Sequence, residues 1–184
     1  MYEIRLHGRG GQGVKLAAHI LGKAAFLSGY RGVQSFAKYG AERRGAPLTS
    51  FVRIDKKEVL ERGYISNPDF IICLDDTLDF ETVTNGLKED GIILINTNKY
   101  PGHFADKKIK NKVYTIDATK IALEVLGVPI PNTAILGAFI KLFRKIPLDT
   151  LKRTIEKELK EEGKESLIEK NKKVVEICYK EMKV

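Results

Sequence analysis

A run of glycines near the N-terminus has the residue types and spacing of a site that binds anions. Glycine lacks a Cβ and accepts positive φ, so backbone N–H groups in such a loop can approach a ligand closely. Where the loop opens a helix, the partial positive charge of the helix N-terminus favours a phosphate or pyrophosphate. The candidate binding residues are Gly8, Arg9, Gly10, Gly11, Gln12 and Gly13, with Lys15 as a further nearby cation.

The spacing of Gly8, Gly10 and Gly13 matches G-x-G-x-x-G, which is typical of dinucleotide-binding loops. Those loops have an acidic residue about 20 positions downstream that binds a ribose hydroxyl. Here the corresponding region is Ser28-Gly29-Tyr30-Arg31, and the next acid is Glu42, which argues against NAD. A phosphate-bearing ligand and a structural turn without a ligand both remain open. In either case the Gln12 amide has the reach to bond a ligand or brace the turn.

A second loop rich in glycine and arginine spans residues 39–47. Its glycines and its proline interrupt any regular pattern, which predicts an ordered loop. Arginine forks bind carboxylates and phosphates and are common at interface hot spots. Subunit contact is the favoured interpretation, while ligand binding and local bracing by a Glu42–Arg pair remain open. The candidate interface residues are Tyr39, Glu42, Arg43 and Arg44.

The other polar candidates are scattered along the chain. His7 borders the glycine loop and is expected to brace the turn, with ligand contact as the alternative, whereas His19 falls in an amphipathic helix. Asn132 precedes a helix and is expected to cap it, again with ligand contact as the alternative. Cys73 and Cys178 are too few and too far apart in sequence for a zinc or iron–sulfur site. We therefore predict no catalytic residue and no metal site in this chain.

Strands alternate with helices through most of the sequence, as hydrophobic periodicity and turn residues indicate. The expected strands are 2–7, 48–54, 70–74, 92–96 and 113–117. The expected helices are 16–27, 78–87, 120–126, 133–143, 148–161 and 166–182. This order predicts an α/β three-layer sandwich around a mostly parallel sheet, with a mixed sheet as the alternative. It would open with a Rossmann-like β-loop-α unit, end in a helical C-terminal tail and form a single domain over residues 1–184.

The charge of the 184-residue chain is concentrated in its first third. The formal net charge is +8, and residues 1–54 hold nine basic and two acidic residues, a net +7. The sequence has no basic stripe interleaved with aromatic residues, which is the pattern that would indicate nucleic-acid binding. The longest uncharged stretch, 125–140, contains two prolines and is too short to span a bilayer, so no membrane partner is expected. The first residues do not have the pattern of a signal peptide, which predicts a cytoplasmic protein.

Five segments together resemble one protein family. The chain is similar to the gamma subunits of pyruvate:ferredoxin oxidoreductases over residues 2 to about 140. The matching segments are Ile4–Gly13, Tyr39–Pro47, Pro68–Leu78, Gly91–Thr97 and Pro131–Phe139.

The resemblance implies a multisubunit enzyme that decarboxylates a 2-oxoacid on thiamine diphosphate with Mg²⁺. It passes electrons through [4Fe–4S] clusters to ferredoxin and transfers the acyl group to coenzyme A. The chain has neither a Cys-x-x-Cys-x-x-Cys run nor a Gly-Asp-Gly segment leading to Asn. The resemblance therefore assigns the cofactors to the alpha, beta and delta subunits and none to this chain alone.

A non-catalytic gamma subunit that helps to dock coenzyme A fits the predicted anion site, because coenzyme A carries a pyrophosphate and a 3′-phosphate. The same loop could instead brace contacts to neighbouring subunits. Pyruvate is the favoured substrate, since the two glycine-containing loops look most like those of the pyruvate enzymes. The alternatives are the gamma subunit of a branched-chain 2-oxoacid (2-oxoisovalerate) enzyme and a Rossmann-type nucleotide- or coenzyme A-binding protein.

Overall fold

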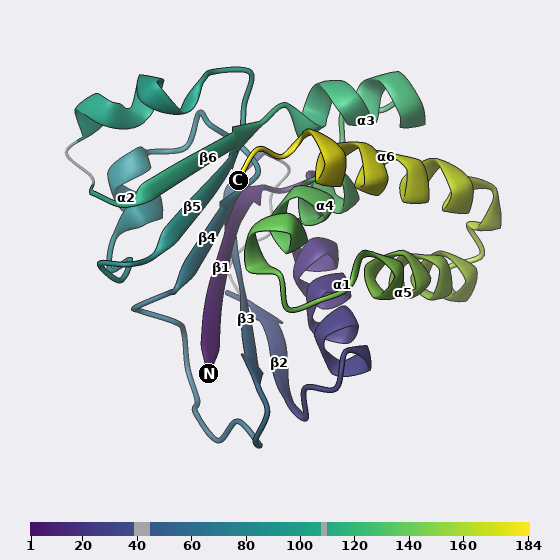
Figure 1. The fold of residues 1–184 in the computed structure, drawn as a ribbon, viewed down its shortest axis with the longest axis horizontal. Coiled ribbons are helices and arrows are strands. Elements are labelled where there is room, and N and C mark those ends of the chain that lie inside the picture. Colours follow the sequence, from purple (N-terminus) through teal and green to yellow (C-terminus); the bar gives the residue numbers. More distant parts are fainter. Residues whose placement is uncertain (39–44, 108–109) are drawn as a thin grey trace.

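The computed structural model describes residues 1–38, 45–107 and 110–184, and a six-stranded sheet runs through it (Figure 1). The strands are β1 Tyr2–Arg9, β2 Gly32–Ala37, β3 Pro47–Asp55, β4 Phe70–Cys73, β5 Ile92–Asn96 and β6 Lys112–Ile116. They lie in the order β2-β3-β1-β4-β5-β6. Strands β1, β4, β5 and β6 are parallel, while β3 is antiparallel to both β1 and β2. The predicted mostly parallel, mixed sheet is confirmed.

Helices cover the two faces of the sheet unequally (Figure 1). The helices are α1 Val14–Leu27, α2 Phe80–Thr84, α3 Ala118–Leu126, α4 Asn132–Phe143, α5 Leu148–Glu161 and α6 Ile168–Glu181. Two 3₁₀ helices, η1 Pro101–Lys107 and η2 Glu165–Leu167, complete the described elements. Helices α1, α3, α4, α5 and α6 share the larger core, in which α5 packs against α1 and α6. Helix α2 packs against β4, and η1 against β6.

The strands reach both cores because their side chains alternate between the two faces. Ile4 and Leu6 of β1 belong to the larger core under α1 and α4, while Ile71 and Cys73 of β4 belong to a smaller core on the other face. The central strands β4 and β5 are buried on both sides, which explains their nearly continuous apolar sequences.

Helices α4 and α6 approach so closely that one helix backbone lies against the other. A Cβ added at Gly137 of α4 would lie 2.2 Å from the carbonyl oxygen of Val175 in α6. Glycine is therefore required at this crossing. The contact holds α4 in place, and with it the start of that helix at Asn132, next to the glycine loop.

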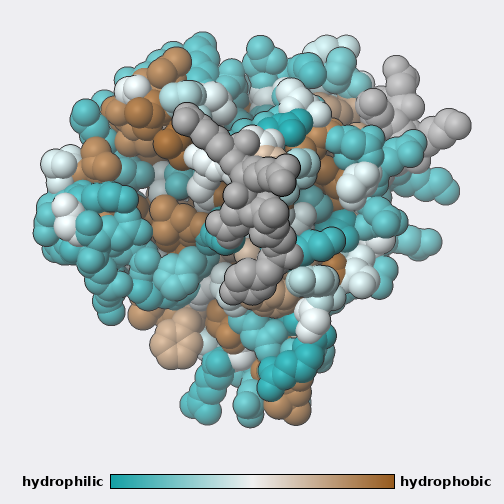
Figure 2. Space-filling view, turned by 180° about the vertical axis from the view of Figure 1, so that it is seen from behind, coloured by the Kyte–Doolittle hydropathy of each residue, from teal (hydrophilic) through white to brown (hydrophobic). Residues whose placement is uncertain are grey.

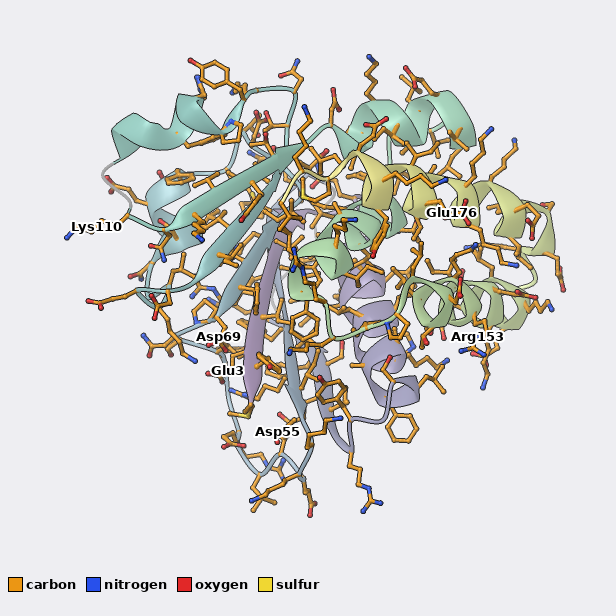
Figure 3. The ribbon with its side chains drawn as sticks, in the orientation of Figure 1. Glu3, Asp55, Asp69, Lys110, Arg153 and Glu176 are labelled. Atoms are coloured by element: carbon orange, nitrogen blue, oxygen red, sulfur yellow. The ribbon has the colours of Figure 1, made fainter. Side chains whose placement is uncertain are left out.

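Charged residues gather at the amino ends of β1 and β4, where Glu3 and Asp69 lie near each other (Figure 3). Asp69 Oδ2 accepts the backbone N–H of Glu3 at 2.7 Å, Glu3 pairs with Arg53 at 3.0 Å, and Lys88 pairs with Asp69 at 2.8 Å. The Glu3–Arg53 pair joins β1 to β3, and the hydrogen bond from Glu3 joins β1 to the residue that precedes β4. They lie at the opposite end of the strands from the glycine loop.

Two local predictions differ from the structure. Strand β2 was not expected, because Gly32-Val33-Gln34-Ser35-Phe36-Ala37 has no long apolar run and derives its pairing from β3. The helix predicted over 78–87 is only α2, since Asp79 caps it through the N–H of Thr82 and the residue after Thr84 already leaves the helical conformation. No helix of the described ranges is long and apolar enough to cross a membrane.

Candidate functional site

The glycine loop has the backbone geometry that its residue types predict. Gly11 has φ 98° and Gly13 has φ 75°, both in the left-handed region that favours glycine. A Cβ at Gly8 would lie 2.6 Å from the Val14 side chain, and a Cβ at Gly13 would lie 2.3 Å from Asn132 Nδ2. A Cβ at Gly11 would meet no atom within 4 Å. Gly8 and Gly13 are therefore packing positions, whereas Gly11 faces open space.

Three of the loop's backbone N–H groups, those of Arg9, Gly10 and Gln12, are used within the protein. Gly10 donates to the carbonyl of Ala46 at 2.9 Å, and Gly45 donates to the carbonyl of Gly10 at 3.1 Å. Gln12 donates to the carbonyl of Arg9 at 3.1 Å. Among the described residues, no acceptor faces the N–H groups of Gly11 and Gly13. These two donors lie just before α1 and are placed to meet a ligand.

Gln12 and Arg9 tie the loop to the segment that follows β4. Gln12 Oε1 accepts the backbone N–H of Arg9 at 2.7 Å, and Gln12 Nε2 donates to Asp75 Oδ2 at 2.7 Å. Arg9 Nε lies 3.3 Å from the same Asp75 oxygen, while its Nη atoms donate to the Gly45 carbonyl and to Thr77 Oγ1. Gln12 thus braces the turn, and the charge of Arg9 is largely balanced by Asp75.

Asp75 is held as a carboxylate. Its partial burial opposes ionisation, but hydrogen bonds from the hydroxyl and backbone N–H of Thr77, the bond from Gln12 and the charge of Arg9 outweigh that effect. The pKa of Asp75 is therefore lowered from its usual value. At neutral pH, Gln12 and Arg9 of the glycine loop therefore contact an ionised carboxylate.

A polar cavity of about 310 Å³ adjoins the loop at the carboxyl ends of β4, β5 and β6. The strand order reverses between β1 and β4, which is the usual place for ligands in open α/β sheets. Carboxylates in the cavity accept hydrogen bonds and repel phosphates. The cavity therefore suits a group that donates hydrogen bonds. Its lining residues are Gln12, Leu74, Asp75, Asp76, Asn96, Thr97, Asn98, Asp117 and Thr119.

Apart from Gln12, sequence reasoning missed these cavity residues. The available signal was a pair of polar residues directly after each apolar strand, as in Asp75-Asp76 and Asn96-Thr97. The carboxyl ends of adjacent parallel strands meet at one edge, so such pairs converge. Asn96 shows the result, because its amide bonds the Leu74 carbonyl and both the hydroxyl and the backbone N–H of Thr119.

Helix α4 brings a second N-terminus to the loop. Asn132 is its first residue and accepts the N–H of Thr133 at 2.7 Å, while Pro131 occupies the N-cap position itself. The Asn132 side chain also packs against Gly13. The partial positive charges of α1 and α4 therefore meet beside the N–H groups of Gly11 and Gly13.

Comparison with known proteins supports the resemblance along nearly the whole chain. A profile of the pyruvate ferredoxin/flavodoxin oxidoreductase family matches residues 3–181. The chain belongs to this family.

Relatives of full length carry more specific names. Pyruvate synthase subunit PorC of Methanocaldococcus jannaschii is 49% identical, over 99% of this chain and 97% of that protein. The pyruvate/ketoisovalerate oxidoreductases common subunit gamma of Pyrococcus furiosus is 44% identical, over 100% of this chain and 98% of its own length. The crystal structure of pyruvate oxidoreductase subunit PORC from Thermotoga maritima superposes with a TM-score of 0.85 at 39% identity, covering 99% and 97% of the two chains.

The sheet order separates this family member from NAD-binding Rossmann domains. In those domains the second strand lies beside the first and leads to the acid that binds ribose. Here antiparallel β3 lies beside β1, and β2 is the edge strand, two positions away. The β1-loop-α1 unit is Rossmann-like, but its surroundings are not.

The histidines of the oxidoreductase chain have structural contacts. His7 is buried with Nδ1 3.4 Å from Thr49 Oγ1, and burial, with a smaller effect of the Arg5 charge, lowers its pKa to about 3. It is a neutral side chain under the turn. His19 is about half exposed on α1 and lies 3.2 Å from Glu158 of α5.

The cysteines are free and buried, and burial raises the pKa of Cys73 and of Cys178 to about 12. Across the three described ranges, no three His, Cys, Asp or Glu side chains are grouped to hold a metal ion. The predicted interface residues Tyr39, Glu42, Arg43 and Arg44 lie outside the described residues.

Proposed function

We propose that this chain is the gamma subunit of a pyruvate:ferredoxin oxidoreductase, which converts pyruvate to acetyl-CoA and reduces ferredoxin. The observation that supports this proposal most directly is the match along nearly the whole chain to subunits named for that enzyme, at 49% identity in one case. A structural, non-catalytic role agrees with its chemistry, because its buried thiols resist ionisation and Asp75 is engaged in holding the glycine loop.

The choice of 2-oxoacid belongs to other subunits in this proposal. The Pyrococcus furiosus relative is named as common to a pyruvate and a ketoisovalerate enzyme. One kind of gamma chain therefore serves two substrates there. A branched-chain 2-oxoacid enzyme is the second candidate for the present chain on that observation.

The partners in this proposal are the alpha, beta and delta subunits, with ferredoxin as the electron acceptor. Thiamine diphosphate, Mg²⁺ and the [4Fe–4S] clusters would reside in those subunits. We place the enzyme in the cytoplasm, because both cysteines are unpaired thiols and reducing compartments preserve such thiols. Residues 1–184 would work as one gamma domain, since a single sheet connects the N-terminal strand with every helical layer.

Coenzyme A is the ligand that we propose for the glycine loop. The N–H groups of Gly11 and Gly13 and the N-termini of α1 and α4 suit a phosphate. Arg9 offsets the charge of Asp75 and so weakens the repulsion between that carboxylate and an anion at the loop. The alternative is that the same groups brace a neighbouring subunit.

The test is Gly11→Asn in the assembled enzyme. Asparagine tolerates positive φ, and the site of the new Cβ is open, so the substitution blocks ligand approach with little strain. Gly29→Asn is the matched control, because Gly29 has φ 89°, equally open surroundings and a position beyond the far end of α1.

We expect Gly11→Asn to raise the KM for coenzyme A at least fivefold, with the KM for pyruvate as the internal reference. The Gly29→Asn enzyme should match the wild type in both constants. An unchanged KM for coenzyme A in an intact Gly11→Asn complex would refute coenzyme A binding by the loop. The alternative, that the loop braces a neighbouring subunit, would then stand.

A further inference from the structure

Three aromatic rings form a stacked row on one face of the sheet. Phe36 of β2 stacks on Phe51 of β3 with centroids 5.1 Å apart, and Phe51 stacks on Tyr64 at 5.2 Å. The rings are nearly parallel, with interplanar angles of 24° and 22°. Phe51 is buried, whereas Tyr64 at the end of the row is 52% exposed. The row thus presents a pre-ordered aromatic ring to the solvent.

Among the described elements, no helix packs closely on this face of β2 and β3. Helix α1 packs on the opposite face, where its Gly22 touches Val33 and Ser35 of β2. The helical elements on the aromatic side, α2 and η1, contact β4 and β6 instead. The segment after β3 lies here instead, since Gln34 of β2 donates to the carbonyls of Val59 and Glu61, and the residue between them, Leu60, is 70% exposed four residues before Tyr64.

A lysine, Lys38, lies beside the Tyr64 ring, with its Nζ atom 5.8 Å from the ring centre. The segment that carries Tyr64 exposes charges of both signs, Lys57 and Arg62 together with Glu58 and Glu61, while Lys56 lies over the Tyr30 ring. The visible surface of the molecule, seen from behind in Figure 2, is largely hydrophilic and is interrupted by hydrophobic patches. An exposed aromatic ring with a cation beside it is a favourable place for an acidic partner.

We propose that Lys38, Leu60 and Tyr64 form a docking surface for an acidic surface of a neighbouring subunit of the oxidoreductase. This inference rests on the proposed function, because it takes its partner from that enzyme. Tyr64 supplies a large contact area at low entropic cost, since Phe51 already fixes its ring. Lys38 supplies the charge, and its position over the ring leaves it close to whatever covers Tyr64.

The surface also lies next to the glycine loop. Lys38 donates its N–H to the Thr49 carbonyl, and His7 on the neighbouring strand faces Thr49. A subunit seated on Tyr64 would therefore approach the carboxyl end of β1, where the loop begins. This places the contact near the site that we assign to coenzyme A.

The experiment uses the complete enzyme, co-expressed with an affinity tag on a different subunit. Tyr64→Ala removes the exposed ring, whereas Lys38→Glu reverses the charge over that ring and keeps all three aromatic side chains. Tyr100→Ala is the matched control, because Tyr100 is 72% exposed and precedes η1 near the other end of the sheet. The retained fraction of this chain is measured during serial dilution at low and at high salt.

We expect Tyr64→Ala and Lys38→Glu each to weaken retention at least tenfold, with the effect of Lys38→Glu diminished at high salt. Tyr100→Ala should be retained like the wild type. Wild-type retention of both variants would overturn the docking surface while leaving the proposed function intact. A wild-type chain that co-purifies with no other subunit would overturn the proposed function itself. If Tyr64→Ala fails to fold, Lys38→Glu decides alone.

Discussion

The bond between Gln12 and Asp75 offers the sharpest test of how the glycine loop is held. Gln12→Glu keeps the size of the side chain and the oxygen that accepts the N–H of Arg9. It removes the donor that bonds Asp75 at 2.7 Å and places a second carboxylate there. The substitution therefore converts an attractive contact into a repulsive one without creating a cavity.

The expected loss of unfolding free energy is about 2–3 kcal/mol at pH 7.5. A hydrogen bond to a charged group contributes about 1.5–3 kcal/mol, and repulsion between the carboxylates adds to this unless the new side chain swings into solvent. The repulsion raises the pKa of one carboxyl in the folded variant, so a proton bridges the pair in acid. The penalty is thus present above that raised pKa and shrinks as the pH falls through it. Wild-type Asp75 has a lowered pKa, so its own bonds persist over that range.

The assay is urea-induced unfolding at pH 5, 6 and 7.5, with Asp75→Asn and the double variant as partners in a mutant cycle. The single substitution Asp75→Asn is itself unfavourable beside Gln12, because two amide donors can then face each other. In the double variant, the new asparagine can donate to the new glutamate, and Arg9 retains a carboxylate nearby. We expect the double variant to recover at least half of the summed losses. Losses that add within about 0.5 kcal/mol would refute the direct bond.

Three further outcomes follow from the packing and burial of particular residues. Gly137→Ala should cost more than about 3 kcal/mol in urea unfolding, because its methyl group would meet the Val175 carbonyl of α6 at 2.2 Å and neither backbone yields easily. Gly13→Ala should cost about 2 kcal/mol by the same assay, through positive φ and contact with Asn132, and adding Asn132→Ala should restore part of the loss. His7 should show constant ring resonances by NMR between pH 8 and pH 5, because its folded pKa is about 3. Since this value is depressed below 6.5, His7 favours folding fully above pH 6.5, and that contribution falls as the pH drops toward 3; titration of the ring near pH 6.5 would contradict its burial.

Local patterns predicted most of the elements because each pattern matches one buried surface. The apolar run at Ile92–Asn96 is a strand with those bounds, and the amphipathic segment Leu148–Glu161 is a helix with those bounds. Strand β2 escaped prediction because its short, partly polar sequence is a strand only through its pairing with β3. Helix α2 proved shorter than its periodicity suggested because Asp79 caps it late and Gly86, at φ 75°, follows it soon.

The sequence by itself determined the strand, the glycine loop and the helix that make an anion site, because those features depend on neighbouring residues. It also determined the family resemblance, which the full-length relatives confirm. Only the tertiary structure decided what surrounds the loop. Asp75 is 63 positions from Gln12, yet it bonds the Gln12 amide and pairs with Arg9, so the first basic residue of the site is already neutralised. Asn132 reaches Gly13 from the start of α4. Such contacts arise because parallel strands and packed helices bring distant chain segments to one edge of the sheet, and no local pattern encodes which polar groups meet there.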